Sequence, residues 1–163
     1  MLAAYRSILL GCGPRAKAHA KVYPDIPSIE LTGVCDQDAL RRGEFAREYG
    51  IANAYDDYEA ALQAERPDIV HVVTQPTRRV WEVECAIRAG VRAVILEKPI
   101  AIRPSELQRL DELHRESGIE IITNTQRRYF PEATDGVLHE IVRHRLGQLY
   151  CIRCSTRGNL MEM

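Results

Sequence analysis

The sequence of 163 residues lacks the marks of several large protein classes. Its formal net charge at pH 7 is only −1, with both signs interspersed, so it has no electrostatic footprint for nucleic acid or an anionic membrane. Its N-terminus reaches Arg6 after five residues, so neither a signal peptide nor a membrane span can be built from it. We therefore expect a cytoplasmic protein without nucleic-acid or membrane partners.

The cysteines are scattered along the sequence. The five cysteines are Cys12, Cys35, Cys85, Cys151 and Cys154. This odd number is typical of reduced thiols in a cytosolic protein. The C-x-x-C pair at 151 and 154 could hold half of a zinc site or form a redox couple. It lies in a strand-like run that turns the two thiols to opposite faces, and no second pair follows, so we predict no metal site.

The histidines do not supply a metal site either. His139 and His144 are five residues apart and miss the i, i+4 spacing that would place both on one helix face. His19, on the first expected helix, is predicted to pack or to form a hydrogen bond. His71, inside an apolar run, is predicted to be a buried core residue with its hydrogen bonds satisfied.

What the sequence does contain is a regular alternation of apolar, β-rich runs with helical patterns. The expected strands are 7–10, 29–35, 52–55, 68–74, 93–96 and 120–123, and the expected helices are 14–23, 38–50, 57–64, 80–89 and 104–117. Six short strands separated by helices predict an α/β fold, a doubly wound parallel sheet of the Rossmann type with right-handed crossovers.

A glycine-rich turn follows the first expected strand. Residues 11–16 read G-C-G-P-R-A and match the pattern G-x-G-x-x-A. Gly11 permits the tight turn, Gly13 lets a phosphate approach the backbone, and Ala16 lets the helix pack close to the strand. The first amides of that helix, with the positive end of its dipole, would hold a pyrophosphate.

An acidic residue ends the second expected strand. Asp36 lies 20 residues after Ala16, the spacing at which a carboxylate binds the ribose 2′-OH of a dinucleotide. The turn and this residue together indicate a Rossmann domain that binds NAD. The carboxylate would repel the 2′-phosphate of NADP, although Arg41 and Arg42, about one helix turn further on, weaken this discrimination.

Two more loops follow the fourth and fifth expected strands, at the edge where open parallel sheets bind ligands. The first reads Thr-Gln-Pro-Thr over 74–77, and the second begins with Glu97, Lys98 and Pro99. A partly desolvated lysine exchanges a proton readily, so Lys98 is a candidate acid–base group, and Pro99 stiffens its loop. The alternative for Lys98 is an ordinary surface salt bridge.

The pattern changes after Thr123, and we place a domain boundary there. Residues 1–123 are predicted to form the NAD(P)-binding Rossmann domain. Residues 124–163 would contain a linker, a helix at 132–145 and a strand at 148–156, which cannot bury a core of their own. We expect them to be the truncated start of an α+β substrate domain.

These motifs, in order and at matching intervals, resemble those of the Gfo/Idh/MocA oxidoreductases. The segments that carry the resemblance are 11–19, Asp36, 55–58, 67–70, 89–90, 97–101 and 127–131. The Glu-Lys-Pro sequence at 97–99 is the most specific of them. Family members are NAD(P)-dependent dehydrogenases and related enzymes that act mostly on sugars, inositols and similar polyols. The resemblance implies hydride transfer between nicotinamide and a sugar- or polyol-like secondary alcohol or carbonyl.

The resemblance also implies roles for matching positions. Lys98 would be the catalytic lysine, with a hydrogen bond to the substrate oxygen near the nicotinamide, and Glu97 would act beside it and help to shape that pocket. Asp36 would contact the adenosine ribose. The other cofactor-binding positions would be Gly11, Gly13, Pro14, Arg15 and Ala16 at the pyrophosphate, and Thr74, Gln75 and Pro76 under the nicotinamide ribose.

The sequence departs from the family in two places. Val80 stands where the family usually has a histidine, and Arg78 and Arg79 precede it. This arginine pair either favours an anionic substrate or is solvated charge at the start of a helix. The aspartate and histidine that the family's second domain supplies are absent from the sequence.

These absences leave a second function open. A dinucleotide-binding module or fragment without catalytic turnover is the alternative, because the acid–base partners of Lys98 and the cover over the nicotinamide pocket are missing. The resemblance further implies a homo-oligomer, since in such enzymes the sheet missing here is commonly the interface.

Overall fold

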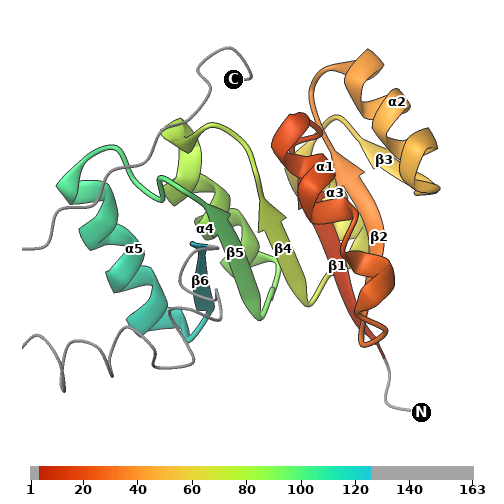
Figure 1. The fold of residues 1–163 in the computed structure, drawn as a ribbon. Helices are drawn as coiled ribbons and strands as arrows, with labels where there is room; N and C mark the ends of the chain where they lie inside the picture. The colour runs from red at the N-terminus through yellow and green to blue at the C-terminus, as the bar shows by residue number, and fades with distance from the viewer. Residues whose placement is uncertain (1–3, 126–163) are drawn as a thin grey trace, which may run out of the picture. The chain divides into compact units, whose positions relative to one another are not determined.

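A computed structural model gives the structure of the protein and describes residues 4–125 (Figure 1). The expected domain 124–163, with its helix at 132–145, its strand at 148–156 and both cysteines of the C-x-x-C pair, lies outside the described residues except for Asn124 and Thr125. The domain boundary therefore stays a prediction.

Six parallel strands form one sheet in the order β3-β2-β1-β4-β5-β6 (Figure 1). The strands are β1 (Tyr5–Leu10), β2 (Ile29–Cys35), β3 (Asn53–Tyr55), β4 (Ile69–Val72), β5 (Ala93–Glu97) and β6 (Glu120–Asn124). Every neighbouring pair is parallel, so every connection is a crossover. The predicted Rossmann-type α/β sheet is confirmed.

Five α-helices and two short 3₁₀ turns connect the strands. They are α1 (Pro14–Ala20), η1 (Tyr23–Asp25), α2 (Ala39–Tyr49), α3 (Tyr58–Glu65), η2 (Pro76–Arg78), α4 (Arg79–Arg88) and α5 (Pro104–Ser117). Asp38 and Asp57 cap α2 and α3 by accepting a backbone hydrogen bond, and Gly50 and Gly118 end α2 and α5 in the left-handed conformation. The first helix is shorter than predicted, because Pro24 falls in a separate 3₁₀ turn.

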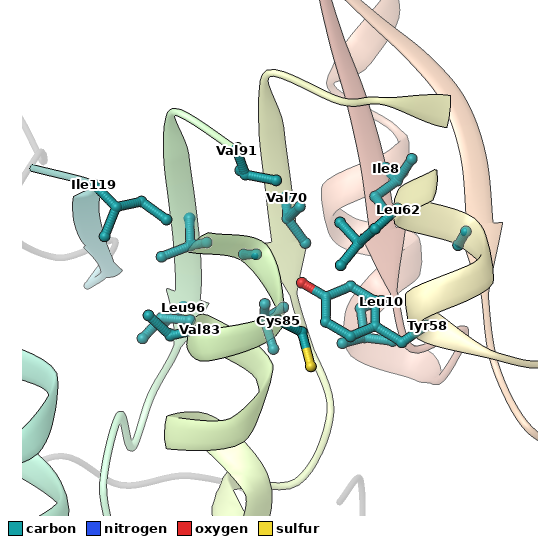
Figure 2. Close-up of a cluster of buried hydrophobic side chains, with 14 of the residues drawn as sticks. Ile8, Leu10, Tyr58, Leu62, Val70, Val83, Cys85, Val91, Leu96 and Ile119 are labelled. Carbon is teal, nitrogen blue, oxygen red and sulfur yellow. The ribbon is translucent and has the colours of Figure 1, made fainter. Parts of the chain in front are cut away.

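Each face of the sheet has its own apolar core. On one face, residues of β1, β4 and β5 pack against α3, α4 and α5; Figure 2 shows Ile8, Val70 and Leu96 of this cluster among the helix side chains. On the other face, Leu9 and Val34 pack against α1 and α2. Consecutive residues of one strand serve opposite faces, as the side-chain alternation of a strand requires.

Two further features are absent from the residues that the structure describes. No helix in residues 4–125 combines the length and apolar character needed to cross a bilayer. Over the same stretch, His, Cys, Asp and Glu side chains do not gather in a group of three or more that could hold a metal ion.

Candidate functional site

The loops that carry the predicted site residues leave the sheet at its carboxyl edge. The chain runs from β1 outward to β2 and β3, and then returns to the other side of β1 to begin β4. Such a reversal of strand order leaves a crevice above the sheet, and open α/β sheets bind their ligands there. The loops after β1, β2, β4 and β5 meet at this point.

Gly11 shows why the turn after β1 needs glycine. Its φ is +98°, and a Cβ atom added there would lie 3.3 Å from the Val73 carbonyl group and from the Thr74 amide nitrogen. A side chain would therefore be strained and would press on the loop after β4. The glycine turn and that loop are packed backbone to backbone.

Gly13 differs, because a Cβ atom added there would meet no protein atom within 4 Å. Its backbone is extended, at φ −74° and ψ −178°, which other residues adopt freely. Nothing in the described fold explains a glycine here, and the space beside it is open to a ligand.

Some backbone amides of the glycine turn donate to acceptors within the protein, and others do not. The amides of Gly11, Cys12 and Ala16 donate to Cys35 O, Asp36 Oδ2 and Gly13 O, and Pro14 has no N–H. The amides of Gly13 and Arg15 have no acceptor within the part of the chain that the structure describes, so they can donate to a ligand. Fewer of the first helical amides face outward than the sequence suggested, because Pro14 has no N–H and the Ala16 amide donates to Gly13.

Asp36 is held firmly beside the glycine turn. Its Oδ2 accepts a hydrogen bond of 2.8 Å from the Cys12 amide, and its Oδ1 accepts one of 2.9 Å from the Asp38 amide. The Arg41 guanidinium lies 3.6 Å from Oδ2, and Arg42 donates to the backbone carbonyl of Asp36 at 2.6 Å. The carboxylate is thus fixed in direction, and both arginines reach the same residue.

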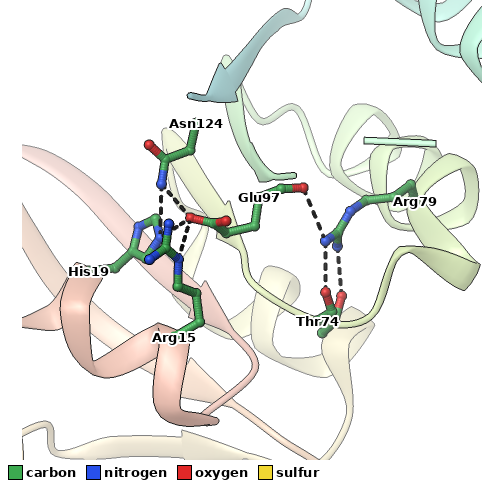
Figure 3. A network of polar contacts seen from close by, with 6 residues as sticks. All are labelled: Arg15, His19, Thr74, Arg79, Glu97 and Asn124. Carbon is green, nitrogen blue, oxygen red and sulfur yellow. Dashed lines mark hydrogen bonds and ion pairs between the residues drawn. The ribbon is translucent and has the colours of Figure 1, made fainter. Parts of the chain in front are cut away.

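Glu97, the last residue of β5, is buried and its Oε1 is an acceptor shared by three side chains (Figure 3). Arg15 Nε and His19 Nε2, both on α1, lie 2.9 Å away, and Asn124 Nδ2 at the end of β6 is the third donor. His19 forms a hydrogen bond, as predicted. Glu97 thereby joins the helix of the glycine turn to two strands that lie far from it in sequence.

The surroundings of Glu97 also fix its charge. Burial alone would raise the pKa of its carboxyl group, but the hydrogen bonds from His19, Arg15 and Asn124 outweigh burial and lower the pKa below its ordinary value. The group is therefore an anion at neutral pH, and Nε2 of His19 carries the proton that it accepts. A carboxylate engaged in this way holds its neighbours in place.

Lys98 follows Glu97 directly, and its side chain is exposed. The peptide bond between Lys98 and Pro99 is cis. Among residues 4–125, no carboxylate forms an ion pair with Lys98, so the described part of the chain does not contain the salt bridge considered above. Lys98 thus lies at the carboxyl edge of the sheet, directly after the last residue of β5.

Arg79 contradicts both interpretations of the arginine pair. Its side chain is 1% exposed and forms an ion pair of 3.0 Å with Glu82, one turn further along α4. It is therefore neither solvated nor available to a substrate. Arg78 is the exposed member, and its guanidinium stacks on Trp81 with 4.0 Å to the ring centroid. The i, i+3 spacing of Arg79 and Glu82 is the signal that could have revealed this pair.

Arg79 and Glu82 both form hydrogen bonds with the loop after β4. The Thr74 hydroxyl donates to Glu82 Oε1 at 2.6 Å and accepts from Arg79 Nη1 at 2.8 Å. Gln75 is exposed, and Pro76 begins the 3₁₀ turn η2. Of the three residues predicted to pass under the nicotinamide ribose, Thr74 has no free hydroxyl donor, and Gln75 has the most accessible side chain.

His71 is buried, as predicted, and contacts the rings of His19 and Tyr23 with centroid distances of 5.4 Å. Neither of its ring nitrogens has a hydrogen-bond partner within the described residues, so the prediction of a satisfied histidine is wrong. The nearby Tyr23 hydroxyl is already paired with Ser7 at 2.7 Å, and His19 with Glu97. Burial, with a smaller contribution from His19, lowers the pKa of His71 from 6.5 to about 4.

Comparison with known proteins assigns this arrangement to a family of enzymes. The Gfo/Idh/MocA family model, an oxidoreductase family with an NAD-binding Rossmann fold, matches residues 5–125. D-apiose dehydrogenase of Paraburkholderia graminis is 29% identical over 127 residues, a match that covers 78% of this chain and 34% of that protein. D-glucoside 3-dehydrogenase of Escherichia coli is 32% identical over 145 residues, covering 83% and 41%. The chain thus spans well under half the length of these curated relatives.

Solved structures share the fold. An oxidoreductase from Agrobacterium radiobacter, in complex with NAD+, L-tartaric acid and magnesium, has a TM-score of 0.79 at 23% identity, covering 85% of this chain and 41% of that one. Scyllo-inositol dehydrogenase from Lactobacillus casei, with bound NAD(H) and scyllo-inositol, has a TM-score of 0.76 at 19% identity, covering 84% and 42%. At these identities the similarity establishes the fold alone.

Because His71 is buried and neutral, the stability of the fold depends on pH. Between the folded pKa of about 4 and the ordinary 6.5, the unfolded state binds a proton that the folded state does not. Stability therefore falls as the pH drops through this window, and we expect His71 to account for about 2 kcal/mol of the loss between pH 7 and pH 5. Urea unfolding of wild type and His71→Phe at both pH values measures this term. Equal losses in the two proteins would contradict it.

Proposed function

Because this chain belongs to the Gfo/Idh/MocA oxidoreductase family, we propose that it binds NAD and serves hydride transfer between the nicotinamide and a sugar- or polyol-like secondary alcohol or carbonyl. One observation carries the proposal: the open glycine turn, the fixed Asp36 and the exposed Lys98 lie at the same carboxyl edge of the sheet. The sugar dehydrogenases among the relatives support the substrate class.

The residues present fit a dinucleotide. The open space at Gly13 and the two outward amides of the turn would receive the pyrophosphate. Arg15 would add its guanidinium there, because Glu97 holds its Nε while 42% of the side chain stays exposed. Pro14 presets the helical backbone that follows Gly13, and Ala16, fully buried, lets α1 pack on the sheet.

We assign Asp36 to the adenosine ribose, with NAD preferred over NADP. Its carboxylate is fixed by two amides and retains lone pairs for a ribose hydroxyl, and its charge would repel a 2′-phosphate. Arg41 and Arg42 do not reverse this preference. Arg41 is shared between Asp38, at 3.2 Å, and Asp36, and Arg42 is engaged by the Asp36 carbonyl.

NAD, when bound, supplies the hydride acceptor or donor. We assign to Lys98 the proton at the substrate oxygen, since its ammonium group is exposed at the strand end and can donate a hydrogen bond to that oxygen. Glu97, expected above to act with Lys98 in catalysis, is assigned a positioning role, because its Oε1 already accepts from three donors. The loop at 74–76 would contact the cofactor through its backbone and through Gln75.

A binding module without turnover is the second candidate. It is favoured by the surroundings of Lys98, because no carboxylate within residues 4–125 forms an ion pair with this lysine. In that case the cofactor assignments to Asp36 and Gly13 would still apply, and the assignment to Lys98 would not. The homo-oligomer expected above is compatible with either candidate and belongs to the proposal.

The cofactor assignment is tested first by calorimetric titration with NADH and with NADPH. Wild type is expected to bind NADH more tightly than NADPH, and Asp36→Ala to weaken NADH binding by about tenfold, because a charge-assisted hydrogen bond to the ribose is lost. Asp36→Asn should favour NADPH relative to wild type. Asp111→Ala, on the exposed side of α5, is the control. Saturable NADH binding that Asp36→Ala leaves unchanged would refute the assignment.

A substitution at Gly13 tests the proposed pyrophosphate site, because it should change NADH binding without changing the stability of the fold. Gly13→Ala should leave the unfolding midpoint unchanged, because its Cβ meets no protein atom, and weaken NADH binding by at least about tenfold, because that Cβ occupies the pyrophosphate space. Gly43→Ala, also without a contact within 4 Å, is the matched control and should retain binding. Gly11→Ala should instead destabilise the fold. An unaltered NADH affinity in Gly13→Ala would contradict the proposed site.

Turnover separates the two candidate functions. NAD reduction is measured with D-apiose, D-glucosides and scyllo-inositol, with wild type, Lys98→Met and the surface control Lys21→Met. We expect Lys98→Met to lose about 100-fold or more in rate while its NADH affinity stays within about twofold, since the lysine acts on the proton and not on the dinucleotide. NADH binding with no turnover in wild type would favour the module.

A further inference from the structure

We propose that Arg79 is a positioning residue that sets the separation between the loop after β4 and the end of β5, and so shapes the nicotinamide half of the site. The inference rests on the proposed function. Its basis is that the guanidinium contacts both strand ends. Arg79 Nη2 donates to the Thr74 carbonyl at 2.7 Å and lies 3.5 Å from the Glu97 carbonyl, and Nη1 donates to the Thr74 hydroxyl (Figure 3).

These contacts begin where the pairing of β4 with β5 stops. The last paired residues of β4 and β5 are Val72 and Leu96, so no ladder hydrogen bond fixes the distance between the chains beyond them. Thr74 and Glu97 are the first residues past this point to be joined, and Arg79 joins them. The planar guanidinium presents its donors in a fixed geometry, so it sets a distance that a flexible side chain would not.

The guanidinium is itself immobilised. It is 1% exposed and paired with the 4% exposed carboxylate of Glu82, and both residues lie on α4. The other oxygen of Glu82 accepts from the Thr74 hydroxyl. Buried charges that are paired and hydrogen-bonded occupy one arrangement, because any other arrangement leaves a charge unpartnered.

Both strand ends also touch the proposed cofactor site. The Val73–Thr74 peptide packs against Gly11 of the glycine turn, with atoms 3.3 Å from where its Cβ would be. Glu97 holds Arg15 and immediately precedes Lys98. A shift of either strand end would therefore move Lys98 relative to the loop proposed to lie under the nicotinamide ribose. The adenosine end, at Asp36, does not contact Arg79.

This division of the site makes the inference testable with two ligands. NADH and ADP share the adenosine and the two phosphates, and only NADH carries the nicotinamide with its ribose. Wild type should bind NADH more tightly than ADP. The double variant Arg79→Met/Glu82→Gln removes the ion pair without leaving a buried charge. In it, we expect the advantage of NADH to fall by about tenfold and the ADP affinity to stay within about twofold.

Two further variants complete the test. Arg79→Lys keeps the positive charge beside Glu82 but cannot reproduce the fork, so it should show the same selective loss even if the double variant fails to fold. Arg88→Met removes an exposed arginine of the same helix, paired with Glu59, and should bind both ligands as wild type does.

The remaining outcomes overturn the inference. An unchanged NADH advantage in a folded double variant and in Arg79→Lys would mean that the clamp does not act on the nicotinamide half. Equal losses for both ligands would assign Arg79 to the stability of the whole fold. Equal wild-type affinities for the two ligands would mean that the nicotinamide is not held. Binding of neither ligand by wild type would instead refute the proposed function itself.

Discussion

The carboxyl edge of the sheet is organised by one buried anion, the carboxylate of Glu97. A carboxylate taken out of water is costly unless hydrogen bonds replace its hydration, and here one oxygen receives donors from α1 and from the end of β6. These hydrogen bonds can form only if α1, the end of β5 and the end of β6 lie together. The position of the glycine-turn helix relative to β5 follows from that requirement, and with it the relation between the turn and Lys98.

The buried charge of Arg79 constrains a neighbouring part of the carboxyl edge in the same way, because its hydrogen bonds require the loop after β4 and the end of β5 to lie together. Its two Nη atoms donate to Glu82, to Thr74 and to the backbone at Glu97, while its Nε has no hydrogen-bond partner among the described residues. The two clusters share Glu97, one through its side chain and the other through its carbonyl group. The loops that frame the site are therefore held by polar groups, while the apolar cores below fix the sheet and its helices. This combination gives the rigid support that a binding site needs.

The fold was predictable because its signals are local. The caps at Asp38 and Asp57, the terminal glycines at Gly50 and Gly118 and the apolar strand runs each act within a few residues, and together they specify a parallel sheet with crossovers. The glycine turn was predictable for the same reason. The donors of Glu97 were not, since Asn124 and His19 lie 27 and 78 residues from it in sequence.

Arg79 and His71 show a different limit. The spacing of Arg79 and Glu82 indicates an ion pair, but the sequence does not show that the pair is buried. The direction of the helix against the sheet decides that Arg78 faces solvent while Arg79 is buried. His71 was correctly expected to be buried, but it has no hydrogen-bond partner among the described residues, because Ser7 and Glu97 already engage its neighbours Tyr23 and His19. Burial follows from the local pattern, whereas hydrogen-bond partners depend on side chains that tertiary structure brings together.

The strand order has a consequence for how the domain holds itself together. Residues 5–55 supply β1, β2 and β3, residues 69–124 supply β4, β5 and β6, and the two halves of the sheet meet only where β1 pairs with β4. Of all the pairings in the sheet, this seam closes the longest loop of chain, and its entropic cost is correspondingly the largest. The proposed cofactor site lies directly above the seam, with Gly13 and Asp36 on one half and Lys98 on the other. A dinucleotide bound there would act as a cross-link between the halves, reinforcing the sheet at the pairing that chain entropy opposes most.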